Sequence, residues 1–365
     1  MKITVSKEEI LEKLSHIQNI VEKRNTMPIL SHFLLEAGRN GSSVVATDLE
    51  TAMREPLKIT VEKEGKICIP ARKMFEIVRE IEGDLVCESV DDQWLKIKSG
   101  ASSFRLACLS AKEFPAWPSM EDMTEISIDP KVLTEAIEKT VFAAGENDTR
   151  YTLNGLLFHI MNGQLAVVGT DGHRLAMIRK KIEGMVSAEK KLIVPRKAAA
   201  ELRKLIEKSE SPVTVTLGKN HVLFTHDGIQ FLTRLIEGTY PNYEQVIPSG
   251  NDKKIELDRQ QFSRILRRVA IMSKERSNAV KVDLDAGRMT VTSSNPDVGE
   301  AQDEISIDYT AEKLSLGFNA KYLIDCLDAM LSDKISLEVQ AALSPVLVRD
   351  DGQADYVCVI MPMRI

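Results

Sequence analysis

The chain of 365 residues repeats one pattern three times, and this repetition restricts the folds that it can adopt. Similar segments end each third of the sequence: FRLACLSAKEFPAWP at residues 104–118, FLTRLIEGTYPNYEQVIP at residues 231–248 and YVCVIMPMRI at residues 356–365. A period of roughly 120 residues exceeds the ~20–50 residues of solenoid repeats and matches the size of a domain. The sequence therefore predicts three similar domains, here named repeats 1, 2 and 3, over residues 1–122, 123–249 and 250–365.

Each repeat is predicted to hold two amphipathic helices. Apolar residues spaced three and four apart mark one buried face of the first helix. These sets are Ile10, Leu11, Leu14, Ile17, Ile20 and Val21 in repeat 1, Val132, Leu133, Ile137, Val141 and Phe142 in repeat 2, and Phe262, Ile265, Leu266, Val269 and Ile271 in repeat 3. The second helix begins near Pro70, Pro195 or Asn319, which are residue types that suit a helix start.

Alternating runs between the helices predict strands. Asn40-Gly41 and Asn162-Gly163 are strong hairpin signals, and Ala286-Gly287 lies at the corresponding place in repeat 3. Each repeat then contains roughly eight strands besides its two helices. The fold class is α+β, and the short polar segments between repeats predict rigidly joined domains.

Composition excludes several classes of protein. No apolar run reaches the ~18 residues of a membrane span, and no signal peptide is expected. The five cysteines lack Cys-x-x-Cys spacing, which indicates buried thiols in a reducing cytoplasm. The formal net charge is −6, yet the predicted helices of all three repeats are rich in lysine and arginine. We interpret this bias as one basic face on an acidic body, although ordinary solvated helix faces are the alternative.

Signatures of catalysis are absent from the sequence. It contains no phosphate-binding glycine loop, no dinucleotide fingerprint and no nucleophile elbow, and its six histidines lack metal-ligand spacing. The strongest enzyme candidate is Thr170-Asp171-Gly172-His173-Arg174, where Asp171 and His173 could serve acid–base chemistry. A tight turn, with Asp171 capping amides and Gly172 at positive φ, is the structural alternative. Repeat 1 has the related Thr47-Asp48 in the same place, which favours the turn.

Several motifs together resemble the beta subunit of bacterial DNA polymerase III, the sliding-clamp family, over the whole chain. They are MPILS at residues 27–31, TDGHRLA at residues 170–176, EGTYPNYEQVIP at residues 237–248 and MPMR at residues 361–364. The resemblance implies a DNA-clamp fold in which two three-domain chains join head to tail in a six-domain ring, with helices lining the lumen and sheets outside. It implies a non-catalytic processivity factor of the cytoplasm, associated with the nucleoid, that needs no cofactor or metal.

The resemblance also implies partners and residues. The partners are duplex DNA bound without sequence specificity, a second copy of the chain, the replicative polymerase, the clamp loader, and other polymerases and repair proteins, with no membrane contact. The DNA-binding residues expected from it are Arg24, Asn147, Arg150, Tyr151, Arg196 and Lys197.

A hydrophobic pocket is expected to bind peptides of the protein partners through their aromatic and leucine side chains. Methionine suits such a site because its flexible thioether adapts to many ligands. The expected pocket residues are Leu153, Thr170, Gly172, His173, Arg174, Leu175, Pro241, Val246, Pro345, Val359, Met361, Pro362, Met363 and Arg364.

The dimer interface is expected between repeat 1 of one chain and repeat 3 of the other. Basic residues would face acidic ones across it, which disfavours wrong pairings. The candidates are Lys73, Met74 and Phe104 against Ile271, Met272, Glu300 and Glu304. The alternatives to a clamp are an interaction scaffold that does not bind DNA and an enzyme that uses Asp171 and His173.

Overall fold

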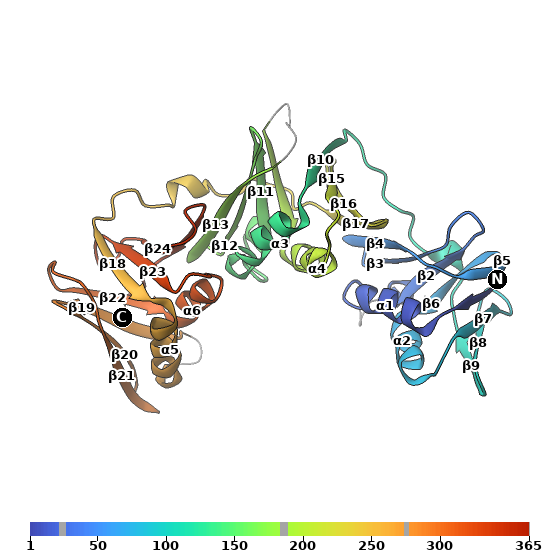
Figure 1. The fold of residues 1–365 in the computed structure, drawn as a ribbon, viewed down its shortest axis with the longest axis horizontal. Helices are drawn as coiled ribbons and strands as arrows, with labels where there is room; N and C mark the ends of the chain where they lie inside the picture. Colours follow the sequence, from blue (N-terminus) through green and yellow to red (C-terminus); the bar gives the residue numbers. More distant parts are fainter. Residues whose placement is uncertain (22–26, 183–188, 274–276, 365) are drawn as a thin grey trace. The chain divides into compact units, whose positions relative to one another are not determined.

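The structure, a computed structural model, describes residues 1–21, 27–182, 189–273 and 277–364 (Figure 1). Within these residues every repeat runs through a strand, a helix, a set of strands, a second helix and three final strands. The helices are α1 (Lys7–Ile17) and α2 (Ala71–Glu80), α3 (Pro130–Glu138) and α4 (Arg196–Ile206), and α5 (Arg259–Val269) and α6 (Ala320–Asp328). The two-helix prediction for each repeat is thereby confirmed.

Repeat 1 contains one strand more than the others among the described residues. Its strands are β1 (Lys2–Val5), β2 (His32–Ala37), β3 (Ser43–Thr47), β4 (Thr51–Pro56), β5 (Thr60–Lys63), β6 (Gly65–Pro70), β7 (Leu85–Ser89), β8 (Trp94–Ser99) and β9 (Ser102–Ala107). Repeat 2 has β10 (Thr124–Ile128), β11 (Gly155–Met161), β12 (Gln164–Thr170), β13 (Arg174–Lys181), β14 (Lys190–Pro195), β15 (Val213–Leu217), β16 (His221–His226) and β17 (Ile229–Arg234). Repeat 3 has β18 (Lys253–Asp258), β19 (Ala279–Asp285), β20 (Arg288–Asn295), β21 (Gly299–Ser306), β22 (Leu314–Asn319), β23 (Lys334–Val339), β24 (Val346–Asp350) and β25 (Tyr356–Ile360).

The strands form four sheets, and two of these combine strands of two repeats. One eight-stranded sheet has the order β10-β15-β16-β17-β4-β3-β2-β6, and the other has the order β14-β11-β12-β13-β25-β24-β23-β18. The junctions are the antiparallel pairs β17·β4 and β13·β25. Smaller sheets, β5-β1-β7-β8-β9 and β21-β20-β19-β22, belong to repeats 1 and 3 alone.

Backbone contacts divide the chain into two compact units rather than three. Unit 1 comprises Met1–Pro130 and Lys204–Leu235, and unit 2 comprises Lys131–Arg203 and Ile236–Ile365. Repeat 2 is shared between the units because its two strand sets belong to different eight-stranded sheets. The domain boundaries at residues 122 and 249 stay a prediction.

Helix ends follow local sequence. The Ser6 hydroxyl accepts a hydrogen bond from the Glu9 amide at 3.2 Å and begins α1, and Asn319 caps α6, as expected for these residue types. The buried face of α5 contains Phe262, Ile265, Leu266 and Val269. Ile271 was expected on that face, but this prediction is wrong. The α-helix ends at Val269, and the Ile271 side chain is 72% exposed.

The hairpin at Asn162-Gly163 and the burial of the cysteines are confirmed. Asn162 and Gly163 both adopt positive φ, +52° and +71°, in the two-residue turn between β11 and β12. All five cysteines are free and buried. Burial raises the pKa of the Cys68, Cys87 and Cys108 thiols to about 12, so these thiols stay protonated and act as small apolar groups. No helix in the described part of the chain is long and apolar enough to cross a membrane.

Candidate functional site

The turn between β12 and β13 is built by side-chain hydrogen bonds. The Thr170 hydroxyl accepts a bond from the Gly172 amide at 3.1 Å and donates one to the Arg174 carbonyl at 2.6 Å. The Asp171 carboxylate accepts bonds from the His173 and Arg174 amides at 2.9 and 3.0 Å. Gly172 supplies the positive φ of +83° that the turn needs. Asp171 therefore acts as a backbone cap, as the structural alternative predicted.

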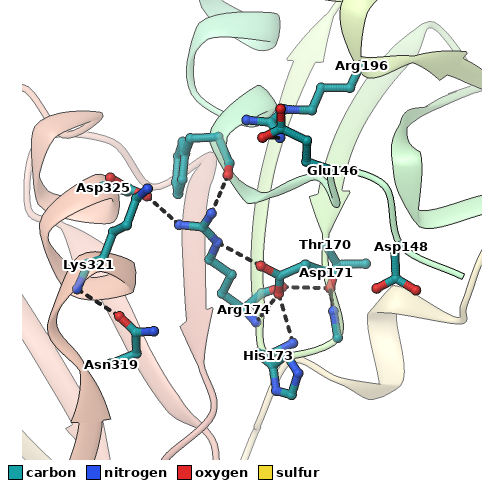
Figure 2. Close-up of polar contacts among 12 residues, drawn as sticks. Glu146, Asp148, Thr170, Asp171, His173, Arg174, Arg196, Asn319, Lys321 and Asp325 are labelled. Atoms are coloured by element: carbon teal, nitrogen blue, oxygen red, sulfur yellow. Dashed lines mark hydrogen bonds and ion pairs between the residues drawn. The ribbon is translucent and has the colours of Figure 1, made fainter. Parts of the chain in front are cut away.

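The buried Arg174 side chain extends from this turn into an ionic network with two half-buried carboxylates (Figure 2). Its guanidinium donates to the Asp171 carboxylate at 3.1 Å, to the Asp325 carboxylate of α6 at 2.6 Å and to the Phe142 carbonyl at 2.6 Å. It also lies 4.5 Å from the ring centre of Tyr322. One side chain of repeat 2 thus pairs with a carboxylate of repeat 3, and two carboxylates compensate the cost of burying its charge.

A mostly apolar cavity of about 230 Å³ adjoins the turn and is lined by residues of repeats 2 and 3. Its lining residues are Arg150, Leu153, Thr170, Gly172, Arg174, Leu175, Pro241, Tyr243, Val246, Val359 and Met361. Below, this cavity is called the apolar pocket. It unites nine of the fourteen pocket residues predicted from the sequence. A concave apolar site with few polar groups is the usual form of a site that binds an apolar side chain.

The remaining predicted pocket residues lie outside this lining. His173 is exposed, and its ring stacks on Tyr322 with the centres 6.4 Å apart. Pro362 and Met363 follow β25 and are half-buried, and the Met363 amide donates to the Gly317 carbonyl at 2.8 Å. Pro345 is also half-buried, and Arg364 is exposed. The backbone of the C-terminal segment is nonetheless tied to the turn, since the Met361 amide donates to the His173 carbonyl at 2.9 Å.

Two residues that line the apolar pocket, Arg150 and Tyr243, were not predicted there from the sequence. Arg150 was expected to contact DNA, yet its guanidinium lies over Gly172 and donates to the Asp148 carboxylate and the Asp171 carbonyl, both at 2.8 Å. The hydrogen bonds from Arg150 lower the pKa of Asp148 to about 2. Tyr243 was missed, although its motif was noted. The signal was its alignment with Trp117 in the repeated segment, two positions after a shared proline.

Comparison with known proteins identifies the family. Sequence profiles for the N-terminal, central and C-terminal domains of the DNA polymerase III beta subunit match residues 1–118, 127–242 and 244–364. The chain belongs to the DNA polymerase III beta-subunit family. Beta sliding clamps from Caulobacter vibrioides and Pseudomonas putida are 37% and 35% identical to it, and each alignment covers 100% of both chains.

Solved structures of the same family share the fold. A sliding clamp from Bartonella birtlesii bound to griselimycin has a TM-score of 0.95 and 35% identity, with 100% of both chains covered. The clamp from Bacillus subtilis has a TM-score of 0.94 at 28% identity and covers 100% of this chain and 99% of its own. The α+β clamp fold and a sliding-clamp role without catalysis follow from the family, and the enzyme alternative is discarded.

The residues expected to contact DNA lie in two segments of this clamp, apart from Arg24, which lies outside the described residues. Asn147 adopts φ +58° in the loop before Tyr151, whose side chain is 77% exposed. Arg196 and Lys197 begin α4, and Arg196 forms an ion pair with Glu146 at 3.0 Å. Arg196 also lines a polar hollow of about 520 Å³, together with His173 and Arg174.

The residues expected at the dimer interface are also spread over several elements. Phe104 is half-buried on β9, Lys73 is exposed on α2, and Glu300 and Glu304 are exposed on β21. Ile271 and the half-buried Met272 follow α5. Met74 is only 1% exposed and contributes to the core of its own chain.

One group of possible metal ligands was not anticipated. Glu12, His16 and Glu55 place ligand atoms within 4.8 Å of one another. The Lys13 ammonium, however, lies 2.9 Å from the buried Glu55 carboxylate. Lysine therefore already supplies a cation to this carboxylate, and His16 adds a hydrogen bond at 3.1 Å.

Proposed function

We propose that two copies of this clamp join head to tail around duplex DNA and that the apolar pocket tethers partner proteins. The arrangement of the strand edges is the observation that supports a closed ring. The last strand of repeat 2, β17, pairs with β4, and the last strand of repeat 3, β25, pairs with β13. The last strand of repeat 1 is β9, and the counterpart of β4 and β13 in repeat 3 is β21.

Both β9 and β21 end their sheets and pair on one side only among the described strands. An unpaired edge offers its backbone to another strand. A contact between β9 of one chain and β21 of the next would repeat the junctions already present within the chain. Two such contacts would close a dimer, because a head-to-tail interface forms a closed ring when its rotation fits.

Charge and exposed apolar area support this interface. Strand β21 carries Glu300, Asp303 and Glu304, whereas Arg105 lies on β9 and Lys73 on α2. Ile271, exposed in the single chain, is the kind of residue that an interface covers. Met74 is left out of the proposed interface because the core of its own chain already buries it.

The ring is tested by charge reversal on β21. The chain has a mass of 40.7 kDa, so the dimer should weigh about 81 kDa by sedimentation. The double variant Glu300→Lys, Glu304→Lys should sediment as a monomer, since like charges would face each other across the interface. Glu312→Lys, an exposed change outside β21, should remain a dimer. A wild-type monomer, or a dimeric double variant, would contradict the β9–β21 interface.

Moderate electrostatic attraction to DNA fits a protein that slides. Helix cations are partly neutralised by acids: Arg267 pairs with Asp328 at 2.6 Å and Arg268 with Asp303 at 2.5 Å. Phosphate contacts are independent of sequence and weaken with salt, so they permit movement along the duplex. We place Asn147, Arg150, Tyr151, Arg196 and Lys197 at the surface that faces DNA, which would bring the protein to the nucleoid.

Partner binding is assigned to the apolar pocket and the adjoining C-terminal segment. The replicative polymerase, clamp loader and repair proteins would each insert apolar side chains of a short peptide. Deleting residues 361–365 should weaken the binding of a peptide with leucine and phenylalanine anchors at least tenfold, measured by fluorescence anisotropy on a variant that still unfolds cooperatively. Unchanged peptide affinity in a folded variant would exclude the pocket. Retained peptide binding without any binding to DNA would favour the scaffold alternative.

A further inference from the structure

A second cavity lies behind one wall of the apolar pocket. It has a volume of about 470 Å³ and is lined by Leu157, His159, Lys191, Ile193 and residues 238–244. Pro241 and Tyr243 line both cavities. Tyr243 is only 4% exposed and packs against Leu157 and Ile193, so its buried ring separates the two cavities.

Hydrogen bonds hold the Tyr243 side chain between the two cavities. Its hydroxyl lies 2.9 Å from Nδ1 of His159, and Nε2 of the same imidazole lies 2.7 Å from the Glu189 carboxylate. Because a carboxylate only accepts, Nε2 carries the proton, and in the neutral imidazole Nδ1 accepts from the tyrosine. Lys191 also binds Glu189, at 2.8 Å. Below, Glu189, His159 and Tyr243 are called the latch.

Repeat 1 has a different arrangement at the same place. His159 pairs with Lys191 across β11·β14, and Glu36 pairs with Lys66 across β2·β6, so Glu36 is the counterpart of His159. Trp117, the counterpart of Tyr243, is covered by the Arg54 guanidinium at 4.9 Å from its ring centre. In repeat 1 a cation–π contact fixes the aromatic ring. In repeat 2 hydrogen bonds hold the Tyr243 side chain instead, to His159 of β11 in the latch and to Arg179 of β13.

We propose that the latch sets the size of the apolar pocket and thereby selects the partner side chain that it accepts. This inference rests on the proposed peptide-binding function. With the latch closed, the Tyr243 ring forms a wall of the 230 Å³ pocket. Once the hydroxyl is released, the ring turns into the 470 Å³ cavity, which has room for it, and the pocket admits a larger anchor.

The selected property is the volume of the anchor side chain. A closed latch suits leucine and phenylalanine, and an open latch suits a bicyclic aromatic group. Other charged groups near Tyr243 are Arg179 and Glu244, which pair with each other at 2.9 Å. Arg179 also forms a hydrogen bond with Tyr243, and it is present in every variant of the test. His159 and Glu189 are positioning residues, because they act through Tyr243.

The test compares two peptides on full-length protein. One has leucine and phenylalanine anchors, and the other carries 2-naphthylalanine in place of phenylalanine. Tyr243→Phe removes the latch hydroxyl and keeps the ring, and His159→Leu removes the latch from the other side. Both variants should shift the ratio of the two affinities toward the naphthyl peptide about three- to tenfold, the range of one hydrogen bond. Tyr309→Phe is the matched control, because its buried hydroxyl donates to the Glu312 carbonyl and it lines neither cavity.

The outcomes distinguish failure of the proposed peptide-binding function from failure of the latch inference. If the wild-type protein binds neither peptide, the proposed function is wrong. If the wild-type protein binds, and both variants keep its affinity ratio within twofold, the latch does not set the pocket size and the inference is overturned. A shift of the same extent in Tyr309→Phe would show that loss of any buried hydroxyl bond changes the ratio, which also overturns it.

Discussion

The turns that join β3 to β4 and β12 to β13 have the same backbone and different surroundings. In the first, the Thr47 hydroxyl accepts from the Leu49 amide at 3.0 Å and donates to the Thr51 carbonyl at 2.9 Å. Asp48 accepts from the Glu50 and Thr51 amides at 3.1 and 2.7 Å. These are the bonds that Thr170 and Asp171 make in the second turn. The Thr-Asp pair therefore builds a turn, and a turn alone makes no binding site.

The difference lies in the residues that the turn presents. Leu49 takes the left-handed conformation at φ +76° and leaves its side chain 51% exposed, whereas Gly172 takes it without a side chain. A Cβ atom on Gly172 would lie 2.7 Å from the Arg150 guanidinium. Arg174 stands where repeat 1 has Thr51. The two turns differ at three positions, and at two of these, Gly172 and Arg174, the second turn lines the pocket.

Giving the second turn the threonine of the first should have the largest effect. Arg174→Thr leaves the half-buried Asp171 and Asp325 without their guanidinium. Since loss of one partner from a fully buried pair costs about 3 kcal/mol or more, a cost of up to about 3 kcal/mol is expected here. The free energy of urea unfolding measures this. Arg349→Thr, which breaks the more exposed pair with Glu338, should cost under ~1 kcal/mol. Equal losses in both variants would contradict the structural role of Arg174.

Giving the second turn the leucine of the first should close the pocket. Gly172→Leu should keep the fold, because Leu49 shows that the turn accepts leucine, but its side chain must displace Arg150. Peptide affinity should fall at least about tenfold, or ~1.4 kcal/mol. Titration of a labelled peptide measures this, with Leu49→Gly as the control that should bind like wild type. Full affinity in Gly172→Leu would separate the turn from peptide binding.

Strand β4, which follows the first turn, carries Glu55, and the corresponding residue on β13 is the uncharged Ile178. Glu55 makes a contact that depends on pH. The hydrogen bond to the buried Glu55 raises the pKa of His16 above its usual 6.5. The contact therefore stabilises unit 1 fully below pH 6.5, and this stability is lost as the pH rises through the folded-state pKa. His16→Gln should lose about 1 kcal/mol at pH 6 and less at pH 9. A difference that is the same at both pH values would exclude the pair as its source.

Giving the first turn the glycine of the second should have the smallest effect. Leu49→Gly relieves a left-handed leucine, and the flexibility of glycine in the unfolded chain offsets much of this gain. A net stabilisation of about 0.5 kcal/mol is expected from urea unfolding. A loss above ~1 kcal/mol would mean that the exposed Leu49 side chain makes stabilising contacts after all.

The structural features that the sequence predicted correctly are those that depend on residues close together in the chain. Apolar spacing predicted the buried helix faces, and Asn162-Gly163 predicted a hairpin, because both signals are local. The junctions β17·β4 and β13·β25 were not predicted, since backbone pairing between distant strands leaves no spacing in the sequence. Tyr243 was missed for a related reason. Its role at two cavities depends on contact with His159, which lies 84 residues earlier in the chain.

Most of the apolar pocket was named from family motifs, which record contacts that periodicity cannot. Those motifs assign residue types to a site without placing each side chain. Arg150, expected at DNA, also lines the pocket, and because its side chain is 56% exposed its contact with DNA stays a prediction. Met74 was likewise expected at the dimer interface. Its spacing on α2 is that of a buried helix residue, and its side chain is buried in its own chain.

Topological retention on DNA tests the central claim most directly. The clamp is placed on nicked circular DNA by a bacterial clamp loader with ATP, the loader is removed by high salt, and the DNA-bound fraction is followed by gel filtration before and after the circle is cut. A closed ring predicts that the clamp stays on the circle and leaves within minutes of linearisation. Equal dissociation from circular and linear DNA would show that the protein holds DNA by contacts alone and would contradict the ring.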